Sequence, residues 1–168
     1  MGETPLHWAA WNGHLDICKL ILENVEDKNP QDESGWTPLH GAAENGYLAV
    51  CQLIIENVDV KNPKNKNNLT PFHVAAQNGH LAVCQLIIQN VEDKNPKAQY
   101  DGTPLHYAAK NGHLEICQLI IDSVEDKNPR DHFTKTPYNV ATEFGHIAIC
   151  EMITLKIKEQ MSKCDLVL

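Results

Sequence analysis

The stretch Thr103-Pro-Leu-His-Tyr-Ala-Ala-Lys-Asn-Gly112 decides how this chain folds, because near-copies of it recur along the whole sequence. Its opening Thr-Pro pair returns every 33 residues, at Thr4, Thr37, Thr70, Thr103 and Thr136. Self-similarity at a fixed period of this length is typical of a stacked array in which each repeat contacts only its neighbours. We therefore divide the chain into one array of five repeats, with the bounds 4–36, 37–69, 70–102, 103–135 and 136–168.

Within the quoted stretch the residues predict a short helix. The Thr103 hydroxyl can accept a free backbone N–H at the helix start, and Pro104 suits the first helical position. Leu105, Ala108 and Ala109 form a narrow apolar stripe that lets a neighbouring helix approach closely. Gly112 ends the helix, since glycine readily takes the left-handed conformation that reverses the chain.

A second helix is expected over residues 113–122, where six apolar residues leave very little polar face. A single repeat cannot bury so much apolar surface, so the folding free energy must come from stacking against its neighbours. The polar segment that follows contains Pro129, which forbids helix, and it predicts an extended finger or turn leading to the next Thr-Pro pair.

These residues resemble the ankyrin repeat, whose signature Thr-Pro-Leu-His-x-Ala recurs at a period of 33 residues. The signature is matched by 4–9, 37–42 and 103–108 and, with one change, by 70–75. The resemblance implies an all-α repeat solenoid of stacked antiparallel helix pairs joined by β-turn fingers. It also implies a curved array whose first helices line a concave face.

Three features depart from that pattern. The second helices close with Asn24-Val25, Asn57-Val58, Asn90-Val91 and Ser123-Val124, where the family usually has Gly-Ala, and we expect a left-handed asparagine cap that is shifted by one residue. In the third finger Gly102 comes one place later than Gly35 does in the first, which predicts a different finger tip. The fifth repeat lacks the motif histidine and continues into a long, lysine-rich segment, which predicts a polar C-terminal capping helix.

Charge limits the classes of partner. The chain has 14 Lys or Arg against 22 Asp or Glu, for a formal net charge of −8, and Arg130 is its single arginine. Phosphate backbones are bound by clustered Lys and Arg, so nucleic acid is not an expected partner. Repeat 4–36 has six acidic residues against two lysines. This acidity indicates a solvated, aggregation-resistant surface or a docking face for a basic partner.

We expect an intracellular, cytoplasmic and monomeric protein without direct membrane insertion. No apolar stretch is long enough to span a bilayer, and Met1-Gly2-Glu3 leads into the first repeat without a signal-peptide pattern. Leu6 and Asp165 stand where myristoylation and prenylation motifs need other residues. Because no finger precedes Thr4, we expect the chain to be a fragment of a longer array or a segment cut at a repeat boundary.

Five of the six cysteines share one repeat position, namely Cys18, Cys51, Cys84, Cys117 and Cys150. Stacked helices lie about 8–10 Å apart, which is too far for neighbouring thiols to form a disulfide or to share a zinc ion. We expect these five to be reduced core residues, in keeping with a reducing compartment. Cys164 alone is a candidate for reactivity.

The histidines form two ladders, and neither predicts a catalytic or metal site. His7, His40, His73 and His106 lie just inside a helix start, with no carboxylate recurring nearby to make a catalytic group. We expect them to hydrogen-bond backbone of their own or the next repeat. A second ladder opens the second helices and includes Tyr47, which a metal-ligand position would not accept; its histidines are His14, His80, His113 and His146. We expect no cofactor and no metal, and no phosphate-binding loop is present.

Function must then lie in the repeat positions that vary. The residue after the motif histidine and the residue after Ala-Ala differ most between repeats, and finger tips differ as well. We expect the partner-binding residues to be Trp8, Trp11, Trp36, Glu44, Gln77, Tyr100, Tyr107, Lys110 and Phe133. The aromatic members are the expected anchors, because Trp and Tyr bury much area at a small entropic cost. Trp8 and Trp11 have a second interpretation, in which they cover the surface that a preceding repeat would bury.

Two classes of function remain open. The first is a non-catalytic protein–protein interaction scaffold that binds a protein of unknown identity through its concave face and finger tips. The second is a structural or spacer fragment of a longer array that has no specific ligand of its own. An enzyme is not expected, because no set of residues with a catalytic arrangement occurs in the sequence.

Overall fold

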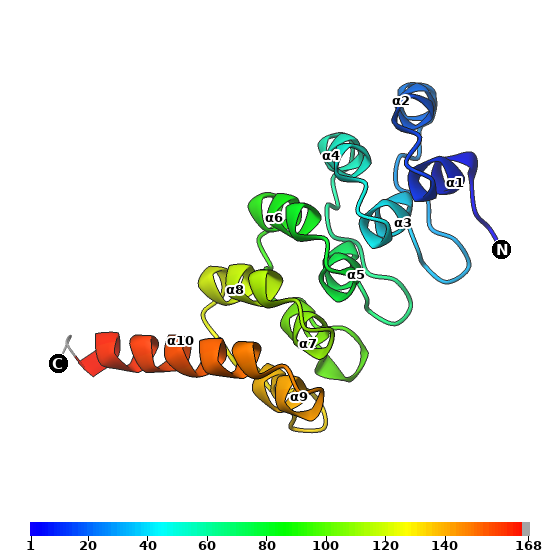
Figure 1. The fold of residues 1–168 in the computed structure, drawn as a ribbon. Helices are drawn as coiled ribbons and strands as arrows, with labels where there is room; N and C mark the ends of the chain where they lie inside the picture. The colour runs from blue at the N-terminus through cyan, green and yellow to red at the C-terminus, as the bar shows by residue number, and fades with distance from the viewer. Residues whose placement is uncertain (166–168) are drawn as a thin grey trace.

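The chain folds into two parallel rows of helices, as Figure 1 shows for the computed structural model, which describes the backbone of residues 1–165 and the side chains of residues 1–162. One row contains α1 (Pro5–Trp11), α3 (Pro38–Glu44), α5 (Pro71–Asn78), α7 (Pro104–Lys110) and α9 (Pro137–Glu143). The other contains α2 (Leu15–Asn24), α4 (Leu48–Asn57), α6 (Leu81–Asn90), α8 (Leu114–Ser123) and α10 (Ile147–Asp165). Each helix contacts its row neighbours and its pair partner. No strand occurs among residues 1–165, so the architecture is the all-α repeat solenoid expected from the sequence.

Each helix of the first row begins at the proline that follows a repeat's threonine. The threonine backbone is extended, and its side chain and that of the third helical residue cap one another's backbone N–H groups. At the other end of α5 the chain reverses through Gly79, whose φ is +82°. A side chain on Gly79 would also lie 2.7 Å from the ring of His113, so glycine is required there twice over.

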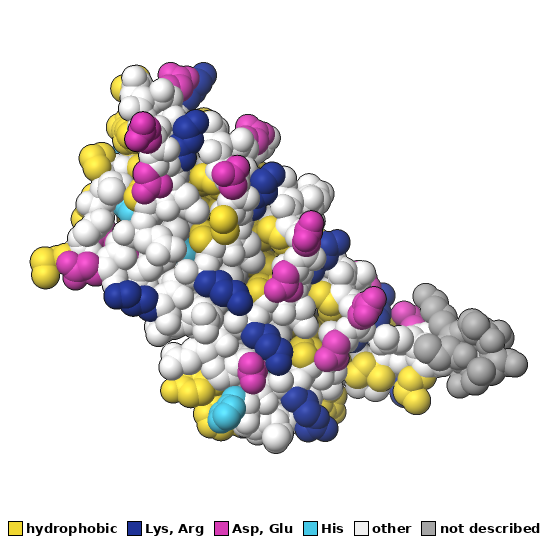
Figure 2. Space-filling view, turned by 180° about the vertical axis from the view of Figure 1, so that it is seen from behind, with side chains coloured by type: hydrophobic (Ala, Val, Ile, Leu, Met, Phe, Trp, Pro, Cys, Tyr) yellow, Lys and Arg dark blue, Asp and Glu magenta, His cyan; other side chains and the backbone are white. Residues whose placement is uncertain are grey.

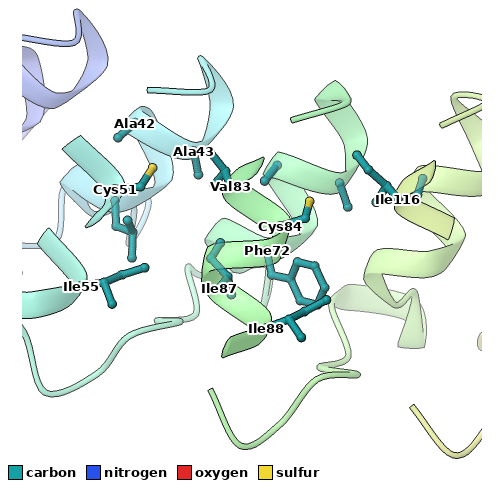
Figure 3. Close-up of a cluster of buried hydrophobic side chains, with 14 of the residues drawn as sticks. Ala42, Ala43, Cys51, Ile55, Phe72, Val83, Cys84, Ile87, Ile88 and Ile116 are labelled. Carbon is teal, nitrogen blue, oxygen red and sulfur yellow. The ribbon is translucent and has the colours of Figure 1, made fainter. Parts of the chain in front are cut away.

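The core runs continuously between the two rows. Figure 3 shows Cys51 and Cys84 at equivalent places in successive repeats, with Ala42, Ala43 and Phe72 packed beside them. All five of these side chains are fully buried. The paired alanines at the end of each first helix allow the close approach that lets branched side chains of the second helices fill the rest.

The prediction that these asparagines form left-handed helix caps is wrong. Asn24, Asn57 and Asn90 are instead the last helical residues, and each is followed by a valine in extended conformation. Their side-chain amides donate to the carbonyl four residues earlier, at 2.8–2.9 Å. Because the amide satisfies a free carbonyl at the helix end, the chain leaves the helix without a left-handed residue.

The fingers differ as the sequence predicts, but for another reason. Asp32 accepts hydrogen bonds from the N–H groups two and four residues later, and Asn65 and Asp131 do the same. Ala98 occupies this position in the third finger and has no acceptor. That finger forms the 3-10 turn η1 (Gln99–Asp101) instead, with Tyr100 and Asp101 both left-handed and Gly102 at φ −63°.

Backbone hydrogen bonds also tie each finger to the next. Lys66 donates to Ser34, Gln99 to Asn67, and His132 to Tyr100, all at 2.8–3.0 Å. The fingers therefore stack in register with the helices, and their tips lie along one edge of the array. This stacking brings finger residues and first-helix residues onto the same face.

The last helix, α10, is nearly twice as long as the other second-row helices and packs on α8 and α9. Ile149 and Ile153 are buried against them, and Lys156 pairs with Asp122 at 2.9 Å. Its exposed surface carries Ile147 and Leu155 as well as charged residues. A capping role for this helix stays a proposal. The division into five repeats up to residue 168 is a proposal as well, and the side chains of 163–168 lie outside the described residues.

One finger position holds a left-handed residue in every copy, at Gly35, Asn68, Asp101 and Thr134. Thr134 is β-branched and has φ +61°, the least favourable pairing of the four. We predict that Thr134→Gly raises the free energy of unfolding by about 0.5–1 kcal/mol, since relieved strain exceeds the added chain entropy. Urea unfolding measures this. Lys66→Gly, in a finger residue without positive φ, is the control and should lose stability; a loss for Thr134→Gly would contradict the argument.

The cysteine ladder predicts an order of reaction. Cys18, Cys51, Cys84 and Cys117 are fully buried, and burial raises the pKa of Cys51, Cys84 and Cys117 to about 12. Cys150 is only half-buried, a correction to its expected core position, because α10 is covered by helices on one side only. The side chain of Cys164 lies outside the described residues, so the test uses a Cys164→Ser variant. In this variant Cys150 should react first with a thiol reagent. The other four should need denaturant, and rapid labelling of Cys84 in the native state would contradict this.

Candidate functional site: two hollows on the first-helix face

The first of two hollows on the finger side of the array lies between α1 and α3. Its volume is about 430 Å³, and it is lined by Trp8 and Trp11 of α1, by Trp36 at the end of the first finger and by Glu44 of α3. Trp11 lies over Gly41, where an added Cβ would come within 3.2 Å of its ring. Trp36 packs on the ring of His40, with 5.2 Å between centroids. Four expected site residues thus meet in one place.

The second hollow lies between α7, α9 and the last two fingers. It has a volume of about 230 Å³ and contains Tyr100, Tyr107 and Lys110. The ring of Phe133, on the following finger tip, lies 5.6 Å from that of Tyr100. The Lys110 ammonium is 5.5 Å from the centre of the Phe144 ring, a cation–π contact. Four more of the expected residues are therefore neighbours.

Gln77 belongs to neither hollow. Its side chain is exposed at the end of α5, and its backbone carbonyl accepts a hydrogen bond from His113 at 3.0 Å. The structure also adds residues that sequence reasoning missed, above all Glu3, Asp32 and Gly41 in the first hollow. Asp32 could be recognised in the sequence only as a turn residue. Gly41 follows the motif histidine, at a position that varies between repeats, and it is the one residue there without a side chain.

The first histidine ladder is structural, as expected. The threonine N–H donates to the histidine Nδ1 at 3.0–3.2 Å in all four copies. Since Nδ1 accepts, we assign the proton to Nε2, which donates to a carbonyl 29 residues further along at 3.0–3.1 Å. Each histidine therefore caps its own helix and holds the finger that leads to the next one.

Burial favours the neutral form of His40, His73 and His106. Desolvation lowers the pKa of His40 and of His73 to about 4, against an opposing effect of the hydrogen bonds to Leu69 and Gly102 respectively. The pKa of His106 is lowered as well, for the same main reason. A buried neutral ring with both nitrogens engaged has no free position for a metal or for proton transfer to a substrate.

The second ladder joins each repeat to the one before it. His80, His113 and His146 each place Nε2 within 2.8–3.0 Å of a carbonyl 36 residues earlier, at the end of a first helix. Tyr47 packs on Gly13 at the equivalent place. The residue before each second helix therefore contributes to the stacking of one repeat on the next. In the part of the chain that the structure describes, no group of three His, Cys, Asp or Glu side chains is placed to hold a metal ion.

Charges are mixed elsewhere on the surface. Figure 2, which views the array from behind, shows Lys and Arg interspersed with Asp and Glu along that face and no continuous basic patch on it. None of the helices within residues 1–165 is long and apolar enough to cross a membrane. The first-helix face is distinguished from this mixed surface by its clustered aromatic side chains.

Paired helices stacked through backbone-capping histidines, with fingers along one edge, define a helical repeat array. The family described as Ankyrin repeats (3 copies) matches residues 6–98 and, in a second overlapping match, residues 72–163. The chain belongs to the ankyrin-repeat family. Ankyrin repeats generally act as protein–protein interaction modules, and the family is typically non-catalytic. No curated protein matches the chain significantly.

The fifth repeat supplies a natural variant for testing the histidine ladder. Asn139 replaces the histidine there and still accepts from the Thr136 N–H at 3.0 Å, while α10 continues to Asp165, so that no finger follows within the described residues. We predict that His73→Asn keeps the helix cap and loses the bond to Gly102. The resulting cost at pH 7.5 should be about 1–3 kcal/mol, because the Gly102 carbonyl is left unpaired.

The same ladder predicts a pH dependence. A folded pKa of about 4, below the ordinary 6.5, means that the unfolded chain binds more protons between those values. Stability is therefore full above pH 6.5 and falls as the pH drops towards 4, with about two protons taken up on unfolding near pH 5 from His40 and His73 together. In His73→Asn about one of these protons should disappear. Urea titrations at several pH values measure this, and an unchanged slope in the variant would refute it.

Proposed function

We propose that this array is a non-catalytic scaffold that binds a protein partner through its first-helix face and finger tips. The observation that carries the proposal is the gathering of eight expected residues into two hollows on one face. They are Trp8, Trp11, Trp36 and Glu44 in the first, and Tyr100, Tyr107, Lys110 and Phe133 in or beside the second. Large aromatic side chains in recessed positions are the usual anchors of protein interfaces.

The position of Trp8 and Trp11 supports binding over the covering of a missing repeat. The surface that a preceding repeat would bury is a separate apolar hollow lined by Pro5, Leu6, Leu20, Ile21 and Val25. The two tryptophans lie instead towards α3, within the first hollow. A spacer without a ligand has no need of exposed tryptophans in this position.

The proposal also covers the cellular location, the oligomeric state and the class of partner. Four fully buried, unpaired cysteines suit a reducing compartment, so we place the protein in the cytoplasm of a cell. We also propose that it acts as a monomer and that nucleic acid is not a partner. We keep the five repeats as the division of the array, with Gln77 of α5 as a contact between the two hollows.

Replacing Tyr100, Tyr107 and Lys110 together by alanine tests the proposed face. Their loss should remove most partner affinity, weakening binding more than about a hundredfold, since each aromatic hot spot contributes roughly 2 kcal/mol. Proteins retained on the immobilised full chain are identified, purified and titrated against both forms. Tyr100 and Lys110 are exposed, and substitutions of exposed residues usually alter stability by about 0.5 kcal/mol or less. Tyr107 is half-buried against the ring of His73, so circular dichroism and melting establish that the triple variant is folded at the temperature of the titration.

The matched control is Gln85→Ala with Gln89→Ala. Both residues are exposed on α6, in the opposite row of helices, and should leave binding unchanged. Gln118 and Asp122 are less suitable, because Asp122 pairs with Lys156 of α10. Loss of binding in the control but not in the triple variant would place the partner on the other side of the array.

A further inference from the structure

All three tryptophans of the chain line the first hollow. Trp8 and Trp11 lie one turn apart on α1, and Trp36 reaches the hollow from the finger that precedes α3. Trp8 and Trp11 are exposed, and Trp36 is half-buried. A single small hollow with so much aromatic surface provides several ring faces, and ring faces attract cations, the indole most strongly.

Besides His7, Ser34 and Thr37, the polar residues of this lining are acidic. Glu3, Asp32 and Glu44 line the hollow, and no lysine or arginine does. The Oε2 atom of Glu44 is buried and has no hydrogen-bond partner. Desolvation accordingly raises the pKa of Glu44 above its usual value.

Gly41 goes with a wider hollow than its counterpart at the last junction. Position 41 corresponds to Val74, Tyr107 and Val140 in later repeats, and the counterpart that is lined by Tyr107 and Val140 has a volume of about 230 Å³, against about 430 Å³ here. Gly41 is buried beneath Trp11. The extra space at the junction of the first two repeats is therefore available because position 41 has no side chain.

We propose that this hollow binds a methylated lysine side chain of the protein partner. An alkylated ammonium is larger and less strongly hydrated than a bare one, so it gains more from the tryptophan faces and loses less on leaving water. The carboxylates of Glu3, Asp32 and Glu44 line the hollow and can accept a hydrogen bond from an N–H donor. Mono- and dimethyl-lysine keep such a donor and trimethyl-lysine does not, so the partly methylated forms should bind best.

This inference rests on the proposed function, because the lysine belongs to a protein partner, and it names the ligand chemistry of one end of the face. The volume of about 430 Å³ lies within the range of side-chain and small-ligand sites. The hollow opens onto the finger side of the array, where a peptide backbone can stay outside while one side chain enters.

Titrations with peptides test the proposal. The probes are mixed-sequence nonapeptides with a central lysine that is unmodified, monomethylated, dimethylated or trimethylated, followed by tryptophan fluorescence and calorimetry. We expect dimethyl-lysine peptides to bind at least about tenfold more tightly than unmodified ones. Gly41→Val gives position 41 the residue found at position 74 and places its Cβ about 3.2 Å from the Trp11 ring, so it should strongly reduce that preference. Gln85→Ala, on α6 in the opposite row of helices, is the matched control and should leave it unchanged.

Glu44→Gln is a second variant that does not depend on filling the hollow. It should remove the preference for dimethyl-lysine over trimethyl-lysine, because the charged acceptor is lost. Equal binding of unmodified and methylated peptides would overturn the proposal. So would choline binding as tightly as the peptides, which would assign the hollow to a free small molecule.

The two proposals fail in different ways. If partners are lost with the Tyr100, Tyr107 and Lys110 variant while methylation has no effect, the scaffold function stands and the methyl-lysine site is wrong. If methylated peptides bind but no protein partner depends on the first-helix face, the scaffold proposal fails and the hollow recognises the modification alone.

Discussion

The structure depends on one interaction, the hydrogen bond from a buried histidine Nε2 to the carbonyl 29 residues further along the chain. The same ring accepts the N–H of its own threonine, so a single side chain starts a helix and fixes the finger that leads to the next. Without its neighbour a repeat would leave this ring and one side of its helices in water. Stability therefore arises between repeats and not within them, as expected of a quasi-one-dimensional array.

That constraint determines where function can reside. The threonine, proline, leucine and histidine of the motif, together with the two alanines, are committed to capping and packing, and they are buried in most copies. The residues that follow the alanines contact the second row through their backbone carbonyls, which any residue can supply. Their side chains can therefore vary without loss of the fold. A glycine at position 41 beside tryptophans at positions 8 and 11 gives a hollow of about 430 Å³ at this junction, and the same scaffold with Val140 at the last junction gives one of about 230 Å³.

The period and motif were sufficient to predict the helices, their stacking and the histidine bonds, because these follow from local chemistry repeated at a fixed spacing. The ends of the second helices were not predictable by analogy with glycine, since Asn57 satisfies a carbonyl with its amide and stays helical. The conformation of the third finger depends on Ala98, whose side chain has no hydrogen-bond acceptor. This lack becomes evident only when Ala98 is compared with Asp32 and Asn65 at the same position of other fingers. For the candidate site, the sequence pointed to the aromatic residues, whose role in binding stays a prediction, but not to their partition into two hollows, which depends on the stacking of the array. Glu3 was missed because it precedes the first repeat.

The two hollows differ in charge as well as in position. The first is lined by three carboxylates and no lysine or arginine, whereas the second contains both Lys110 and Asp131. Carboxylates in a recessed, partly desolvated site attract a cation more strongly than the same groups on an open surface, and at physiological salt this attraction acts within about 8 Å. A cationic side chain is therefore favoured more at the first hollow than at the second, where one lysine offsets one carboxylate. A partner that reaches both hollows would favour one orientation, with its basic group at the N-terminal end of the array, since the reverse orientation would bring that group next to Lys110.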